Sequence, residues 1–111
     1  MASKDILFKV KTPLGVTIHT TRDYWKTITT IKHPVMINYT KEVKDTLADA
    51  SEIRRSKQDT RVYLYYTNIG KVNVCVVAGQ LSSREGYIIT AYLTDRIKEG
   101  QQIYVKNKNV L

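Results

Sequence analysis

The chain has 111 residues, of which 42% are hydrophobic, and this composition suits one globular domain spanning residues 1–111. Eighteen Lys and Arg residues against ten Asp and Glu residues give a formal net charge of +8, which the two halves of the chain share equally. The N-terminus lacks the apolar core of a signal peptide and no run approaches about 18 apolar residues, so we expect a cytoplasmic protein without a membrane span.

Apolar and polar residues alternate on both sides of Pro13, which predicts an N-terminal β-hairpin. His19, at the end of the second strand, would then lie opposite the core face. The apolar residues expected to face the core are Ile6, Phe8 and Val10 on the first strand and Leu14, Val16 and Ile18 on the second.

Two short helices are expected after the hairpin. Thr21 is a suitable N-cap for the first helix, which should present Tyr24, Ile28 and Ile31 on one face and end near His33, before Pro34. In the second helix, Thr40 is the expected cap and Val43, Leu47 and Ala50 form the apolar stripe.

The hydrophobic period then changes to two. The segments "RVYLYYTN", "KVNVCVVAGQ", "GYIITAYLT" and "QQIYVKN" are rich in β-formers and are separated by short polar or Gly-containing turns, which imply antiparallel neighbours. The expected fold class is therefore α+β, with the hairpin and two helices packed on one face of a four-stranded antiparallel sheet and the other face left available.

The segment "GYIITAYLTD" combines an apolar and a polar face. Ile89, Ala91 and Leu93 alternate with Thr90 and Tyr92, so the two sets should lie on opposite sides of the sheet. We expect Thr90 and Tyr92 to point away from the helices, toward the same groove as Arg55.

A basic folded body attracts phosphate polyanions, and nucleic acid is the commonest of them. Tyrosines on strands can stack on bases, and arginine can hold a phosphate with two parallel hydrogen bonds. The residues expected to bind RNA in this way are Lys32, Arg54, Ser56, Tyr63, Tyr65 and Tyr66.

Short motifs follow one another from about residue 16 to residue 106: His19 after a strand, Trp25 in the helix, "KHP" at 32–34, "SEIRRS" at 51–56, "VYLYY" at 62–66, "VNVCVV", and "GYIITAYLTDRIKEG" at 86–100. Their order resembles the phage-associated barnase/EndoU/colicin/RelE-like (BECR-fold) nuclease family. The resemblance implies a metal-independent RNase fold of helices followed by an antiparallel sheet. It also implies a toxin or effector role, with an antitoxin or immunity protein as a further partner.

No Cys/His cluster with zinc spacing and no Gly-rich phosphate loop is present, and the acidic residues are scattered, so we expect no metal and no cofactor. RNA cleavage without a metal uses the 2′-OH as nucleophile and needs a base, an acid and a group that stabilises phosphate charge. His33 and His19 are the proton-transfer candidates, because histidine has an unperturbed pKa of about 6.5. Arg55 is the expected phosphate clamp with Arg54 as substitute, and Thr90 and Tyr92 are the hydrogen-bond donors.

Three functions remain open on the sequence alone. The first is a metal-independent endoribonuclease that leaves a 2′,3′-cyclic phosphate. The second is a non-catalytic RNA-binding module, and the third is a basic domain that binds an acidic protein.

Overall fold

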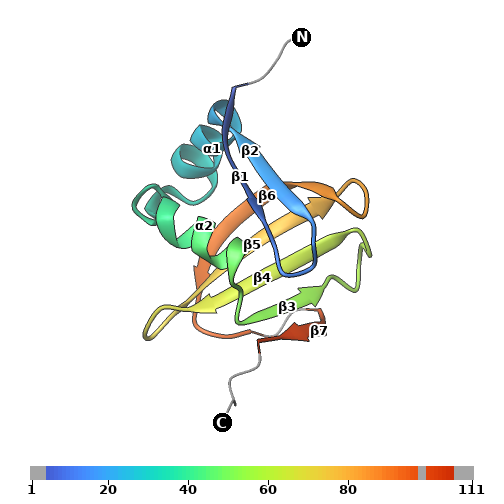
Figure 1. Cartoon of the computed structure of the whole chain (residues 1–111). Helices are drawn as coiled ribbons and strands as arrows, with labels where there is room; N and C mark the ends of the chain where they lie inside the picture. Colours follow the sequence, from blue (N-terminus) through green and yellow to red (C-terminus); the bar gives the residue numbers. More distant parts are fainter. Residues whose placement is uncertain (1–4, 98–99, 107–111) are drawn as a thin grey trace.

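The computed structural model describes residues 5–97 and 100–106 of the chain. Its strands are β1 (Ile6–Lys11), β2 (Thr17–Thr21), β3 (Glu52–Arg55), β4 (Val62–Asn68), β5 (Asn73–Gln80), β6 (Glu85–Thr94) and β7 (Gln101–Val105). Its helical segments are α1 (Arg22–Thr27), a π-helical turn η1 (Ile28–Lys32), a 3₁₀ helix η2 (Pro34–Tyr39) and α2 (Thr40–Ala48). All helical segments thus fall between β2 and β3 (Figure 1).

All seven strands join one sheet in the order β1-β2-β6-β5-β4-β3-β7. The expected four-stranded antiparallel sheet is therefore wrong. β1 and β2 form the predicted hairpin, but β2 also pairs in parallel with β6, which extends the sheet at one edge. β3 lies between β4 and β7, so the segment that holds the two neighbouring arginines is itself a strand (Figure 1).

α1 begins as the sequence predicted, because the Thr21 side chain accepts a hydrogen bond from the Tyr24 amide at 3.1 Å. The helix then widens into η1, in which the His33 amide donates to the Ile28 carbonyl five residues earlier at 2.8 Å. This wider turn changes the helical period. Ile28 is buried as expected, but Ile31 is 75% exposed and does not belong to the apolar face.

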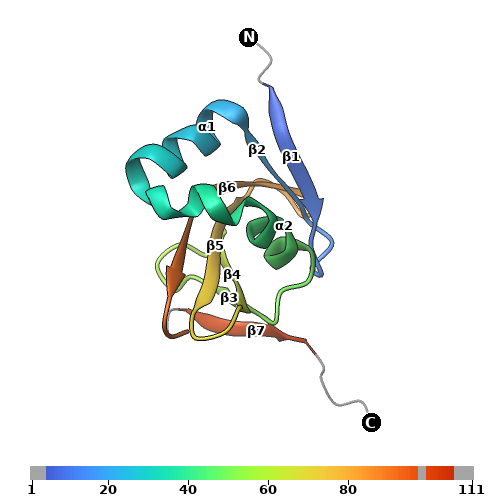
Figure 2. The ribbon, with the colours of Figure 1, turned by 90° about the vertical axis from the view of Figure 1, so that its left-hand side faces the viewer.

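α2 lies across one face of the sheet, where it contacts β1, β4 and β5 (Figure 2). Its predicted stripe of Val43, Leu47 and Ala50 is fully buried in the core. The predicted cap is wrong: Thr40 is the first helical residue, Tyr39 precedes it, and no side chain caps this end. The reason is that η2 runs directly into α2, so Thr40 already has helical dihedral angles.

No helix in the described ranges is long and apolar enough to cross a membrane.

Candidate functional site

Strand register divides the central sheet residues between two faces. Residues that pair directly across neighbouring strands share a face, and successive residues alternate. On the side of α2, which we call the core face, Ile53, Tyr65, Val76 and Ala91 form one row. The opposite side, which we call the rear face, carries two rows: Arg54, Leu64, Val77 and Thr90, and Glu52, Tyr66, Cys75 and Tyr92.

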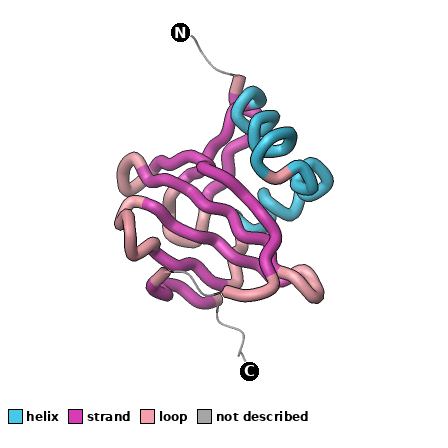
Figure 3. Tube along the Cα trace, turned by 180° about the vertical axis from the view of Figure 1, so that it is seen from behind, coloured by secondary structure: helices cyan, strands magenta, loops and turns pink. Residues whose placement is uncertain are grey.

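The rear face is the side of the sheet that the helices leave uncovered (Figure 3). Its centre is apolar, since Leu64, Tyr66 and Cys75 are buried and Tyr92 packs against them. Its polar groups lie at the two ends of the rows, on β3 and on β6. Val77 and Ile97 also pack against this centre, so it is a covered apolar layer with polar side chains at its margins.

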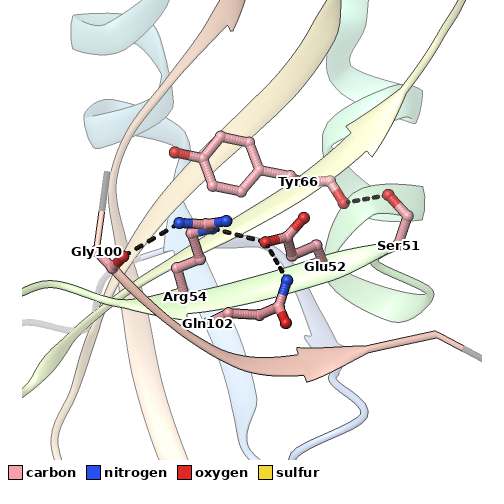
Figure 4. A network of polar contacts seen from close by, with 6 residues as sticks. All are labelled: Ser51, Glu52, Arg54, Tyr66, Gly100 and Gln102. Atoms are coloured by element: carbon pink, nitrogen blue, oxygen red, sulfur yellow. Dashed lines mark hydrogen bonds and ion pairs between the residues drawn. The ribbon is translucent and has the colours of Figure 1, made fainter. Parts of the chain in front are cut away.

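Arg54 is held at one end of this face by two hydrogen bonds. Its Nε donates to Glu52 Oε2 at 2.6 Å, and its Nη1 donates to the Gly100 carbonyl at 3.2 Å (Figure 4). Gln102 donates to the same Glu52 oxygen at 2.9 Å, and the guanidinium lies beside the Tyr66 ring. The Arg54 side chain is 21% exposed. Two of the five N–H donors make these hydrogen bonds within the described chain, and guanidinium N–H groups of this kind also bind phosphate.

Arg55 points to the other side of the sheet. It pairs with Tyr63, and its guanidinium carbon lies 5.6 Å from the centre of the Tyr63 ring, within the core face. The expected groove shared by Arg55, Thr90 and Tyr92 is therefore wrong. Because side chains alternate along β3, Arg54 lies on the same face as Thr90 and Tyr92, although the sequence favoured Arg55 and ranked Arg54 as the substitute.

The tyrosines expected to stack on RNA bases are buried. Tyr63 and Tyr65 are 8% and 1% exposed and belong to the core face, and burial raises the pKa of Tyr65. Tyr66 lies on the rear face but is only 2% exposed, so it forms part of the covered apolar layer. Their abundance on β4 reflects packing in a strand that is covered on both sides.

β6 contains a bulge that sets the orientation of its polar residues. Val77 pairs with Thr90 and Ala78 with Ile88, so Ile89 is the extra residue. Ile88, rather than the expected Ile89, joins Ala91 and Leu93 in the core. Thr90 and Tyr92 lie on the rear face, which agrees with their expected orientation.

His33 borders the rear face at the β6 end. It lies between η1 and η2, and its ring centre is 5.5 Å from that of Tyr92. The ring is half-buried, so it combines contact with the sheet and access to solvent. A histidine next to a row that contains Tyr92 and Thr90 is well placed for proton transfer to a bound substrate.

Thr90 Oγ1 is buried and has no hydrogen-bond partner in the described part of the chain. A buried hydroxyl without a partner costs about 1–3 kcal/mol. A ligand oxygen on the rear face would supply the missing partner.

Thr90→Val keeps the shape of this side chain and removes its hydroxyl. We expect the free energy of unfolding, measured by urea denaturation, to stay equal or rise by about 1 kcal/mol, because no internal hydrogen bond is lost. A ligand that bonds this hydroxyl should bind the variant more weakly. A variant that is destabilised by more than about 1 kcal/mol would show that the hydroxyl has a structural partner.

The other predicted residues lie elsewhere. His19 pairs with Tyr87 on β6, five residues before Tyr92, so the two histidines do not share a site. Lys32 Nζ donates to the Tyr24 hydroxyl at 3.0 Å and to the Ile89 carbonyl at 3.3 Å. Ser56 Oγ accepts from the Gln58 amide at 3.1 Å and thereby shapes the turn after β3.

Glu52 and Gly100 are parts of the Arg54 network that the sequence analysis missed. Opposite charges two positions apart on a strand share a face, so the Glu52–Arg54 pair could have been found from spacing. Gly100 could not, because it reaches Arg54 only through the connection between β6 and β7. Its φ of +85° and a virtual Cβ 2.6 Å from the Arg55 carbonyl oxygen require glycine there.

Within residues 5–97 and 100–106, no group of three or more His, Cys, Asp or Glu side chains could hold a metal ion. Comparisons with protein-family models, curated proteins and solved structures found no match to this chain. The resemblance to the BECR-fold nucleases therefore rests on the short motifs.

Proposed function

We propose that this protein is a metal-independent endoribonuclease that binds RNA on the rear face. The observation that carries the proposal is that one face holds a fixed guanidinium, a buried hydroxyl without a partner among the described residues and a histidine in contact with a tyrosine. These groups match the needs of RNA transesterification: charge stabilisation, hydrogen bonding and proton transfer. The net charge of +8 favours the approach of RNA.

In the proposed reaction, the RNA 2′-oxygen attacks the adjacent phosphorus and the bond to the 5′-oxygen breaks. A base takes the 2′-OH proton and an acid gives a proton to the departing 5′-oxygen. The products are a 2′,3′-cyclic phosphate and a 5′-OH. We assign one of the two proton transfers to His33. Tyr92, whose ring contacts His33, is the hydroxyl-bearing side chain beside it.

Arg54 is assigned to the phosphate. Its bonds to Glu52 and Gly100 fix the plane of the guanidinium before substrate arrives, so little reorganisation is needed when negative charge develops. Strand spacing of about 4.8 Å places the backbones of Arg54 and Thr90 about 14 Å apart, and the long arginine side chain spans part of that distance. A phosphate and the adjacent ribose would fill the remainder.

Purified protein is expected to cut a single-stranded RNA in the presence of EDTA and to leave 2′,3′-cyclic phosphate ends. A DNA oligonucleotide of the same sequence should bind but stay intact, because it lacks the 2′-OH. Mass spectrometry of the products checks both statements. Cleavage of the DNA, or complete loss of RNA cleavage in EDTA, would contradict the proposal.

A non-catalytic RNA-binding module is the second candidate. The separation of His19 from His33 favours it, since cleavage needs a base and an acid at one phosphate and only His33 borders the rear-face row. RNA that binds in a salt-dependent way and stays intact after long incubation would support this function over the first. A toxin or effector role is proposed only together with cleavage, and growth arrest on induced expression tests it.

A further inference from the structure

β2 and β6 separate shortly after they meet. Their parallel pairing covers three pairs, from Thr17–Glu85 to His19–Tyr87, and then Thr21 leads into α1. At the far side of this opening, the Tyr24 hydroxyl donates to the Ile89 carbonyl at 2.6 Å. A pocket of about 350 Å³ occupies the opening, and we call it the wedge pocket; it is lined by His19, Thr20, Thr21, Tyr24, Leu81, Tyr87 and Ile88.

The wedge pocket presents flat and apolar groups to solvent. Tyr87 is 40% exposed and Leu81 is 65% exposed. The Tyr87 ring lies over Gly79, where a Cβ would come within 2.6 Å of its Cζ, so glycine is what allows the ring to lie close to the sheet. An exposed aromatic ring supported in this way is a stacking surface for a nucleobase.

Two polar groups give the wedge pocket hydrogen-bonding capacity. His19 Nδ1 lies 2.8 Å from the Gly86 carbonyl oxygen, and because a carbonyl only accepts, this nitrogen carries the proton. The other ring nitrogen is therefore an acceptor when the ring is neutral. Thr20, which is 3% exposed, has a buried Oγ1 without a hydrogen-bond partner among the described residues. A ligand or a water molecule bound in the pocket would supply its partner.

A second, polar pocket of about 360 Å³ adjoins the first. Its lining includes Lys9, Thr17, Arg84 and Glu85, and His19 lines both pockets. Lys9 pairs with His19 across the hairpin, so the two side chains lie on the same side of the sheet. Two cations against one carboxylate give this pocket, which we call the basic pocket, a net positive charge that suits a phosphate.

We propose that the two pockets together bind one nucleotide unit of single-stranded RNA, with its base in the wedge pocket and its phosphate in the basic pocket. The inference rests on the proposed function, because the pocket pair would extend the substrate path beyond the rear-face site. Tyr87 and Tyr92 lie five positions apart along β6, which corresponds to about 15 Å. The bound nucleotide is thus more than one nucleotide away from the cleaved bond and contributes affinity and length preference.

The first experiment titrates the whole chain with each of the four ribonucleoside 5′-monophosphates and follows chemical shifts by NMR. Shifts should change at His19, Tyr87 and Arg84, and inorganic phosphate alone should affect only the basic pocket. Unchanged shifts at these three residues would overturn the nucleotide site. This measurement needs no cleavage, so it stands even if the chain is not a ribonuclease.

The second experiment compares kcat/KM for a ten-nucleotide RNA with kcat/KM for a dinucleotide, which is too short to reach the pockets. Tyr87→Ala should lower the ratio about tenfold, within the range for loss of one base–aromatic stack. Gly79→Ala, which displaces the ring, and Arg84→Gln should also lower it. Lys71→Gln changes the charge equally in an exposed turn and serves as control.

If Tyr87→Ala and Arg84→Gln leave the ratio of the two kcat/KM values unchanged, the nucleotide subsite is wrong and the ribonuclease proposal still stands. Absence of cleavage with every substrate would instead contradict the proposed function and leave the NMR result to decide the nucleotide site.

Discussion

Arg54→Ala is expected to lower kcat for RNA cleavage by about 10²–10³, the usual loss when one transition-state donor is removed. The guanidinium is fixed by Glu52 and Gly100 on the rear face, and Arg54 belongs to the same row of paired residues as Thr90. Arg54→Lys should recover only part of the rate, because an ammonium cannot reproduce two parallel hydrogen bonds. Single-turnover cleavage of a fluorogenic RNA measures the effect.

The neighbouring arginine provides the matched control. Arg55→Ala removes the same side chain one position later, but that side chain packs on Tyr63 in the core face. We expect kcat to stay within about threefold and the free energy of unfolding to fall by about 1 kcal/mol, the scale of a cation–π contact. Arg54→Ala also removes the ion-pair partner of Glu52, which keeps only its hydrogen bond from Gln102, so both variants need a denaturation curve and rates corrected for the folded fraction.

If Arg55→Ala loses turnover and Arg54→Ala does not, the site lies on the core face and the assignment made here is wrong. Equal losses in both variants, at equal folded fraction, would point to general charge attraction in place of a fixed phosphate contact. A salt titration would then show the same reduction, for both variants, in the slope of log RNA affinity against log salt concentration.

His33→Ala is expected to lower kcat by about 10²–10⁴, the range for loss of a general acid or base. The pH profile of kcat should lose one limb, since histidine side chains titrate between about pH 5 and 8. His33→Gln keeps a polar side chain against Tyr92 and should not restore the rate, because an amide does not transfer protons in this range. Measurements across this pH range with a substrate at saturation separate the proton-transfer step from binding.

His19→Ala is the control for this variant, because it removes the only other histidine of the chain from a different pocket. Its effect should fall on KM for long RNA and leave the shape of the kcat profile unchanged. A His33→Ala protein with an unaltered pH profile would contradict the proton-transfer role and restrict His33 to packing against Tyr92.

Local sequence signals predicted a substantial part of this fold. The period-two pattern located β4, β5, β6 and β7, the alternation around Pro13 located the hairpin, and Thr21 marked the start of α1. Each of these signals depends on residues close together in the chain, which is why spacing alone revealed them. The face of Thr90 and Tyr92 followed from the same alternation, although the bulge at Ile89 did not.

The sequence predicted the types of residue in the candidate site better than it predicted their positions. Arg54 and Arg55 are equivalent in the sequence, and only the pairing of β3 with β4 shows that Arg54 faces the rear side. Likewise, Tyr63, Tyr65 and Tyr66 looked like stacking residues until the sheet proved to be covered over β4 on both sides. Register between strands depends on long-range pairing, so a shift of one residue exchanges every face.

The sequence by itself determined the excess of basic residues, the hairpin, two short helices and the following β region, because composition and periodicity are local properties. Tertiary structure alone decided that β2 pairs in parallel with β6, that β3 completes a seven-stranded sheet, and that His19 and His33 lie at separate places. The pairings of β2 with β6 and of β3 with β7 join residues more than forty positions apart. Their energies come from contacts that exist only after the chain has folded, so no local pattern encodes them.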